Sequence, residues 1–273
     1  MEKTLLYYIL AAILGFMVFF GVKAHHQAIL YENATIELVS YQDAGQQVSL
    51  QFEKIAKSLL GDLYKDEQTM NLKQIKEKQK EAMLKAKEYT LYFMCLLGII
   101  LFSFFFISLR NFTFLGSLAT ILTLILGLIT PVLMVTIHKE VEYLGDIVLS
   151  FESKGVIGSI IKLYESGDII VAAVILLFSV LIPVAKVFSL LFVSVFMENK
   201  FAYGVIRFFK MIGKWSMVDV FVVAVFLVHL TSNNTDISRA EVEVGLYFFL
   251  AYVIVSMLLS VSADKMLSSK RIG

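Results

Sequence analysis

Six long apolar segments constrain what this sequence can fold into. Each is close to or above the roughly 20 residues that a helix needs to cross a bilayer. Lipid offers no hydrogen-bond partners to the backbone, and the segments lack a period of two, so helices are expected rather than a barrel. They are residues 4–22, 91–109, 112–137, 169–197, 215–231 and 244–263. The sequence predicts an all-α polytopic membrane protein with six transmembrane helices.

The composition supports this class and excludes others. Hydrophobic residues make up 58% of the chain and charged residues 17%, against about 45–50% and 25% in soluble domains. The net charge of +1 gives no basic surplus for nucleic acid, and the single Cys95 excludes an intrachain disulfide or a zinc ribbon. Sequence motifs for hydrolysis or phosphoryl transfer are missing. We therefore expect no enzymatic activity, no catalytic residue, no metal and no cofactor.

Basic residues in the short loops predict the orientation. With the N-terminus inside, the cytoplasmic pieces hold Lys3, Arg110, Lys200, Arg207, Lys210, Lys214, Lys265, Lys270 and Arg271. The short outer loops hold only Lys139, Lys154, Lys162 and Arg239. Lysines at 73–87 also lie on the outer side, in a loop that is too long for the rule to count. Both termini are therefore predicted to be cytoplasmic.

Residues 24–88 are the one sizeable region outside the predicted spans. Apolar residues at 48, 52, 55, 59 and 63 have helical spacing, and Lys/Glu pairs three to four apart support a helix over 73–88. We predict an extracytoplasmic helical hairpin that prolongs the first two spans and turns around residues 65–69. This hairpin has two possible roles. It is either structural, as a strut or as a contact between copies of the chain, or it is a docking platform for an envelope partner.

Two connecting segments are amphipathic. The acidic outer loop after the third span carries an apolar stripe, which predicts a short helix on the outer leaflet: Val156, Ile157, Ile160, Ile161 and Tyr164. In the inner loop, residues 198–214, apolar side chains alternate with Arg207, Lys210 and Lys214. Such a basic segment suits the anionic inner leaflet, so these three are candidate lipid-headgroup or interface residues.

Two charged residues fall inside predicted spans, where charges are costly and indicate function. Lys186 follows Pro183 by three residues in the fourth span, and Asp219 lies in the fifth. Both fall in the cytoplasmic halves of consecutive antiparallel helices, so a salt bridge is feasible. Pro183 removes a backbone hydrogen bond and predicts a kink, as in the broken helices that line transporter cavities. The pair either locks two helices together or belongs to a polar core.

Residues 210–224 resemble the signature of the paraquat-inducible protein A family, Gly-Arg-Trp-Ser-Met-x-Asp-Val-Phe. The matching residues are Gly213, Trp215, Ser216, Met217, Asp219, Val220 and Phe221. Residues 130–133 and 181–186 resemble the family's two proline-containing elements. The resemblance covers residues 112–265, one four-helix module. Residues 1–111 then hold the first two spans with the hairpin, and 266–273 form a cytoplasmic tail.

This resemblance implies a component of the bacterial inner membrane that handles phospholipid. It would pass lipid between that membrane and a mammalian-cell-entry domain partner. The resemblance assigns the module's polar core to Lys186, Asp219, Pro183, Trp215 and Ser216. The chain departs from the family pattern because it lacks Cys-x-x-Cys pairs, has one module rather than two, and carries Lys214 where Arg is usual.

Two other functional classes remain open from the sequence. A haem- or metal-binding redox protein would use histidines at the outer ends of the spans, namely His25, His26, His138 and His229. A non-catalytic scaffold or accessory subunit would use the hairpin for assembly and the Lys/Asp pair as a lock between helices.

Overall fold

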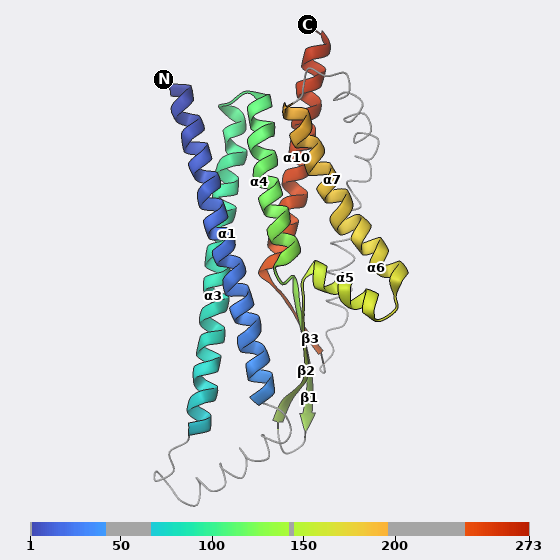
Figure 1. The fold of residues 1–273 in the computed structure, drawn as a ribbon. Coiled ribbons are helices and arrows are strands. Elements are labelled where there is room, and N and C mark those ends of the chain that lie inside the picture. Colours follow the sequence, from blue (N-terminus) through green and yellow to red (C-terminus); the bar gives the residue numbers. More distant parts are fainter. Residues whose placement is uncertain (1, 42–66, 142–144, 196–237, 273) are drawn as a thin grey trace, which may run out of the picture.

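A computed structural model describes residues 2–41, 67–141, 145–195 and 238–272 (Figure 1). Within these ranges, five helices are long and apolar enough to cross a membrane: Leu5–Ser40, Lys73–Phe105, Leu109–Ile129, Ile169–Val195 and Val244–Met266. The spanning part that the structure describes is helical, as predicted, and the chain is a polytopic membrane protein. The predicted span at 215–231 lies outside the described residues.

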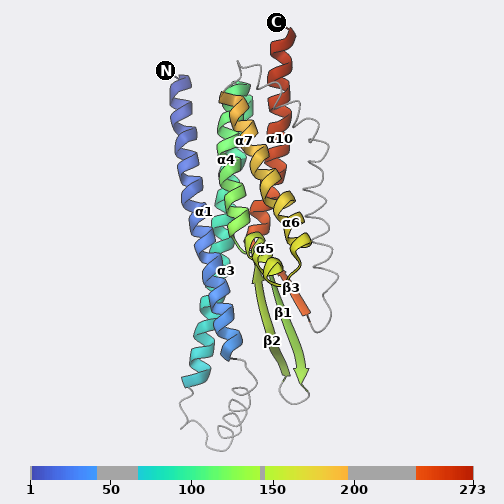
Figure 2. The same ribbon diagram turned by 45° about the vertical axis from the view of Figure 1, so that its right-hand side comes forward.

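Helices α1 (Glu2–Tyr41) and α3 (Glu67–Phe102) pack against each other in antiparallel directions (Figures 1 and 2). Their buried positions recur every three, four or seven residues, which is the heptad pattern of a coiled coil: Met17, Ala24, Ala28, Tyr31, Thr35 and Leu38 in α1, and Ile75, Ala82, Ala86, Phe93, Leu97 and Ile100 in α3. The candidate spanning helix Leu5–Ser40 within α1 has 36 residues and is therefore roughly 54 Å long. Because the hydrocarbon layer is about 30 Å thick, both helices extend past it. We call the side to which they extend the distal side.

This coiled coil confirms the predicted helical hairpin for residues 24–41 and 67–88. The Gln79 Nε2 donates a hydrogen bond of 2.8 Å to the Thr35 Oγ1, and such a pair between helices fixes their register. The turn predicted at 65–69 is wrong in part, because α3 already begins at Glu67. The predicted helical spacing at 48–63 falls outside the described residues.

Helices α4 (Leu109–Ile129) and α10 (Val244–Ile272) pack closely in antiparallel directions. Their contact depends on glycine at Gly127, where an added Cβ would lie 2.8 Å from the Phe249 backbone nitrogen. At Gly245 an added Cβ would lie 2.5 Å from the carbonyl oxygens of Thr130 and Pro131. Small residues let helices approach closely in membranes, where packing replaces the hydrophobic effect as the main attraction.

The third predicted span, 112–137, is too long, because α4 ends at Ile129. Thr130 has an extended backbone with φ −83° and ψ 144°, as expected before Pro131. The chain then forms strand β1 (Leu133–Val141), which pairs with β2 (Gly145–Lys154) and with β3 (Ser238–Val242) in an antiparallel sheet of order β2-β1-β3. This sheet was not predicted from the sequence; it extends to the distal side alongside α1 (Figure 2).

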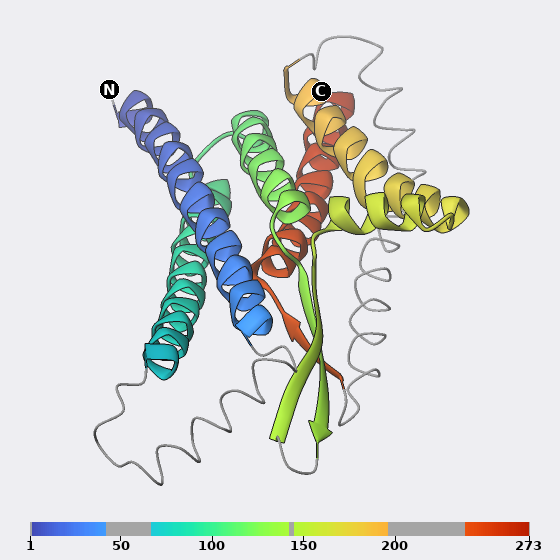
Figure 3. The same cartoon turned by 60° about the horizontal axis from the view of Figure 1, so that its bottom comes forward.

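The predicted short amphipathic helix is present as α5 (Val156–Glu165). The fourth predicted span follows as three pieces: α6 (Ile169–Leu176), the π-turn η3 (Leu177–Leu181) and α7 (Ile182–Val195). Figure 3 shows α5 running outward from the end of α4, and α6 and α7 returning toward the opposite end of α4.

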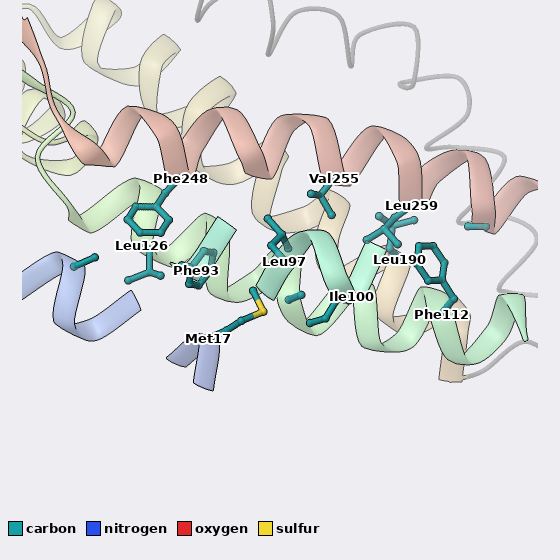
Figure 4. Packing of buried hydrophobic residues seen from close by; sticks show 13 residues of the cluster. Met17, Phe93, Leu97, Ile100, Phe112, Leu126, Leu190, Phe248, Val255 and Leu259 are labelled. Atoms are coloured by element: carbon teal, nitrogen blue, oxygen red, sulfur yellow. The ribbon is translucent and has the colours of Figure 1, made fainter. Parts of the chain in front are cut away.

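One hydrophobic core joins the N-terminal coiled coil to the later helices (Figure 4). The rings of Phe93 and Phe248 meet edge to face, with their centroids 5.0 Å apart. The core also contains Met17, Leu97, Ile100, Phe112, Leu126, Leu190, Val255 and Leu259. The α1–α3 coiled coil is therefore packed into the rest of the protein along its membrane portion.

Candidate functional site

Lys186 is a buried charge at the centre of the helical layer. Its side chain is only 8% exposed, and its Nζ donates a hydrogen bond of 3.1 Å to the Oγ of Ser256 on α10. Ser256 adjoins the central residue of the span Val244–Met266, so the ammonium lies near mid-depth. The backbone of Lys186 lies in the half of its span nearer Val195, consistent with the predicted position.

Ser256 presents an acceptor to this ammonium. Its own hydroxyl hydrogen goes to the Val253 carbonyl at 2.9 Å, which leaves an oxygen lone pair for Lys186. A lysine at the centre of a membrane helix costs about 2.5–3.5 kcal/mol on insertion scales. An interhelical hydrogen bond in a membrane contributes about 0.6 kcal/mol on average. The Ser256 contact by itself is smaller than this cost, and a charged side chain inside a membrane span is a candidate for function.

A row of hydroxyl side chains on α4 adds further polarity to this interior. Each member is fully buried and donates to the carbonyl four residues earlier: Thr113, Ser117, Thr120 and Thr123. The Oγ1 of Thr113 also lies 3.4 Å from the Oγ of Ser262 on α10. Because their hydrogens are committed to the backbone, these oxygens are available to neighbouring groups mainly as acceptors.

The helix carrying Lys186 is irregular on the distal side of that residue. The Ile182 N–H bonds to the Leu177 carbonyl, five residues back, which is the π-turn pattern. Pro183 is buried one residue later and has no N–H for the Ser179 carbonyl. The sequence predicted a kink at Pro183; the structure has a π-turn just before this residue, a feature that often accompanies functional sites.

Arg110 has a role that the sequence analysis missed. Its Nε and Nη2 donate to the carbonyls of Ser194 and Val195 at 3.0 and 3.2 Å. These are the last carbonyls of α7, where the helix dipole favours a cation. Arg110 therefore fixes the end of α7 against the start of α4. Its contacts span 84 and 85 residues of sequence, so no local pattern signals them.

Thr130 lies where four elements meet at the distal end of α4. The Nδ1 of His25 on α1 lies 3.1 Å from its Oγ1. An added Cβ at Gly155, just before α5, would lie 3.4 Å from its carbonyl oxygen, and Gly245 at the start of α10 approaches it even more closely. Among the residues that the structure describes, no group of three or more His, Cys, Asp or Glu is placed to hold a metal ion.

The remaining predicted core and interface residues lie outside the described ranges, as does one candidate histidine: Arg207, Lys210, Lys214, Trp215, Ser216, Asp219 and His229. His138, predicted at the outer end of a span, lies in strand β1 instead. The structure brings Lys186 to Ser256 and Pro183 to the π-turn. The pairing of Lys186 with Asp219 stays a prediction. Ser256 was not singled out, because a serine in an apolar helix gives no signal without its neighbour across the interface.

The family model described as paraquat-inducible protein A matches residues 109–272. The match begins at the start of α4 and includes Lys186, Ser256 and Arg110, whereas α1 and α3 precede it. No curated protein and no solved structure significantly matches the chain.

Proposed function

Because the chain belongs to the paraquat-inducible protein A family, we propose that it is the inner-membrane component of a phospholipid transport system in the bacterial envelope. It passes phospholipid between the inner membrane and a mammalian-cell-entry domain partner, with both of its termini in the cytoplasm. The observation that carries this proposal is the buried Lys186, held by Ser256 near mid-depth within the family-matched region.

The chemistry of Lys186 suits a lipid phosphate. A lysine ammonium is a compact cation with three rotatable donors, so it can exchange one acceptor for another as a headgroup arrives. Ser256 is a neutral acceptor and an anionic phosphate is a stronger one, since charge-assisted hydrogen bonds are roughly twice as strong. Asp219, in the next predicted span, would hold or release the ammonium as the helices move.

The distal arms suit a partner on the outer side of the membrane. The coiled coil of α1 and α3 and the sheet β2-β1-β3 extend in the same direction, and β2 contacts α1 (Figure 2). With the predicted topology both arms stand in the periplasm, where the mammalian-cell-entry domain partner would dock. Lipid transfer of this kind breaks no covalent bond, so the proposed function requires no catalytic residue.

Purification from native cells in gentle detergent tests this function, with bound proteins and lipids identified by mass spectrometry. Lys186→Gln is compared with Lys265→Gln, which removes an exposed lysine near the end of α10. We expect both variants to recover the partner and only Lys186→Gln to lose enriched phospholipid. If the unmodified protein recovers neither, the scaffold class replaces transport. A haem absorption band in that sample would instead favour the redox class.

A further inference from the structure

Four exposed lysines lie on one face of the distal part of α3, and we call them the lysine row: Lys73, Lys76, Lys80 and Lys87. Three of them recur every seven residues, and Lys76 follows Lys73 by three residues and precedes Lys80 by four. Residues at these spacings share one face of a helix. The row covers 14 residue steps and is therefore about 21 Å long.

The lysine row keeps its positive charge in the described structure. The nearby glutamates have other partners or none: Glu81 pairs with Lys85 at 2.6 Å. Glu88 accepts a hydrogen bond of 2.7 Å from the Tyr92 hydroxyl. Glu77 forms no ion pair with the row among the residues that the structure describes. Like charges three or four residues apart destabilise a helix, so the row is unfavourable unless a counter-charge lies against it.

The lysine row faces away from the contact between α3 and α1. The distal part of α3 packs mainly on α1 (Figure 1), through positions such as the buried Ala82 and Ala86. Leu84 lies four residues after Lys80 and three before Lys87, and its side chain is 58% exposed. An apolar side chain with charged neighbours matches the core and rim of a protein–protein interface.

Lipid headgroups are too close to the membrane to cover most of the lysine row. The second predicted span begins at Leu91, and Lys87 lies about 6 Å outside it along the helix. A headgroup layer is about 5–8 Å thick on each side of the bilayer. Measured in the same way, Lys80 lies about 17 Å and Lys73 about 27 Å outside the span. A counter-charge for these lysines therefore comes from a molecule that stands well above the headgroups.

We propose that the lysine row docks an acidic helix of the envelope partner, which stands beside α3 on the outer side of the membrane. Carboxylates that recur every seven residues in that helix lie about 10.5 Å apart, which is the spacing of Lys73, Lys80 and Lys87. Leu84 packs against an apolar residue of the same helix. This inference rests on the proposed function, and it names the surface and the charge by which the partner is held.

Photo-crosslinking in native cells tests which molecule covers the row. Lys80 is replaced by p-benzoylphenylalanine in one variant of the full chain, and Lys78 in another. Both positions are exposed, and they lie about 200° apart around the helix. The cells are irradiated and the adducts are identified by mass spectrometry. We expect one envelope protein at position 80, at least fivefold more abundant than at position 78, and attached through a peptide rich in Asp and Glu.

A binding measurement tests the role of charge. The protein found in the adduct is purified, and its affinity for the full chain in detergent is measured at low and at high salt concentration. Lys76→Glu with Lys80→Glu is compared with Lys78→Glu with Lys85→Glu, which changes the net charge equally on another face. At low salt we expect the first variant to bind at least tenfold more weakly and the second less than threefold. High salt should weaken binding of the unmodified chain.

Several results would overturn the lysine row as a docking surface. Adducts of equal abundance at positions 78 and 80, or none at position 80, would show that the row is an open surface. An adduct at position 80 with a phospholipid, with a second copy or with another part of this chain would give it a different occupant. Unchanged affinity of the row variant would remove the role of charge. If that variant does not fold, Lys76→Gln with Lys80→Gln takes its place.

A lipid-transfer measurement with the same two proteins separates this surface from the proposed function. Charge-dependent docking without transfer of phospholipid would preserve the lysine row and remove the transport proposal. Transfer at the unmodified rate by the row variant would preserve transport and remove the row as the docking surface.

Discussion

Replacing Gly127 by alanine should destabilise the protein, although alanine is the better helix former. An added Cβ at this position would lie 2.8 and 2.9 Å from the Phe249 backbone nitrogen and Cα. These are backbone atoms of α10, so no side-chain rotation relieves the contact and the two helices must separate. Overpacking of this kind costs about 1–3 kcal/mol, and the gain in helix propensity returns about 1 kcal/mol.

Gly98→Ala is the matched control. Gly98 also lies inside a membrane helix, and an added Cβ there would meet nothing within 4 Å. It should gain up to about 1 kcal/mol from helix propensity alone. The two substitutions add the same methyl group, so they should change the free energy of unfolding in opposite directions.

Denaturant unfolding in detergent micelles, followed by the fluorescence of the single tryptophan, measures both variants. We expect Gly127→Ala to unfold at a lower denaturant concentration than the unmodified protein, and Gly98→Ala at an equal or higher concentration. If Gly127→Ala is as stable as Gly98→Ala, the close approach of α4 and α10 is refuted.

Three further predictions concern single contacts. Ser256→Ala removes a hydrogen-bond acceptor of the Lys186 ammonium. It should lower the free energy of unfolding by about 0.6–1.7 kcal/mol, the range for hydrogen bonds between membrane helices. Ser260→Ala, whose hydroxyl bonds to its own helix at the Ser256 carbonyl, should cost less in the same unfolding assay. Arg110→Gln removes two charge-assisted hydrogen bonds to the end of α7 and should lower the free energy of unfolding by about 1.5–3 kcal/mol. Arg110→Lys should recover part of this loss. Equal melting temperatures of the two variants would contradict a role for both nitrogen donors. Gln79→Ala removes the hydrogen bond to Thr35 and should lower local stability by about 0.5–1.5 kcal/mol. The measurement is amide hydrogen exchange, which should be faster in the residues around this bond. Unchanged exchange would show that the bond does not stabilise the coiled coil.

The membrane helices could be predicted because the hydropathy and length of a segment are read from that segment alone. The hairpin at the N-terminus was also readable, since charge pairs near Lys85 and Glu81 recur at helical spacing, and these two side chains do form an ion pair at 2.6 Å. The end of α4 was placed eight residues too late, because Leu133–Ile137 is as apolar as the helix before it. Pro131 gave a signal for the true end, but an apolar window outweighed it.

The contacts of the candidate site could not be predicted as well from the sequence. Lys186 could be identified because the sequence alone shows a lysine within an apolar segment. Its partner Ser256 lies 70 residues away in a helix where serine is unremarkable. In the sheet, β1 pairs with the adjacent β2 and also with β3, which lies far along the chain. Such pairings follow from how the helices pack, which no local spacing records.

Participation of Lys186 in phospholipid transfer can be measured with purified components. The protein is reconstituted with the envelope partner recovered from native cells, and transfer of a fluorescent phosphatidylethanolamine from vesicles to that partner is followed over time. Lys186→Gln should remove at least nine-tenths of the transfer rate while the protein stays folded, and Lys265→Gln, at an exposed position near the end of α10, should leave the rate unchanged. Transfer at the unmodified rate by a folded Lys186→Gln variant would contradict the account and leave Lys186 as a structural contact between α7 and α10.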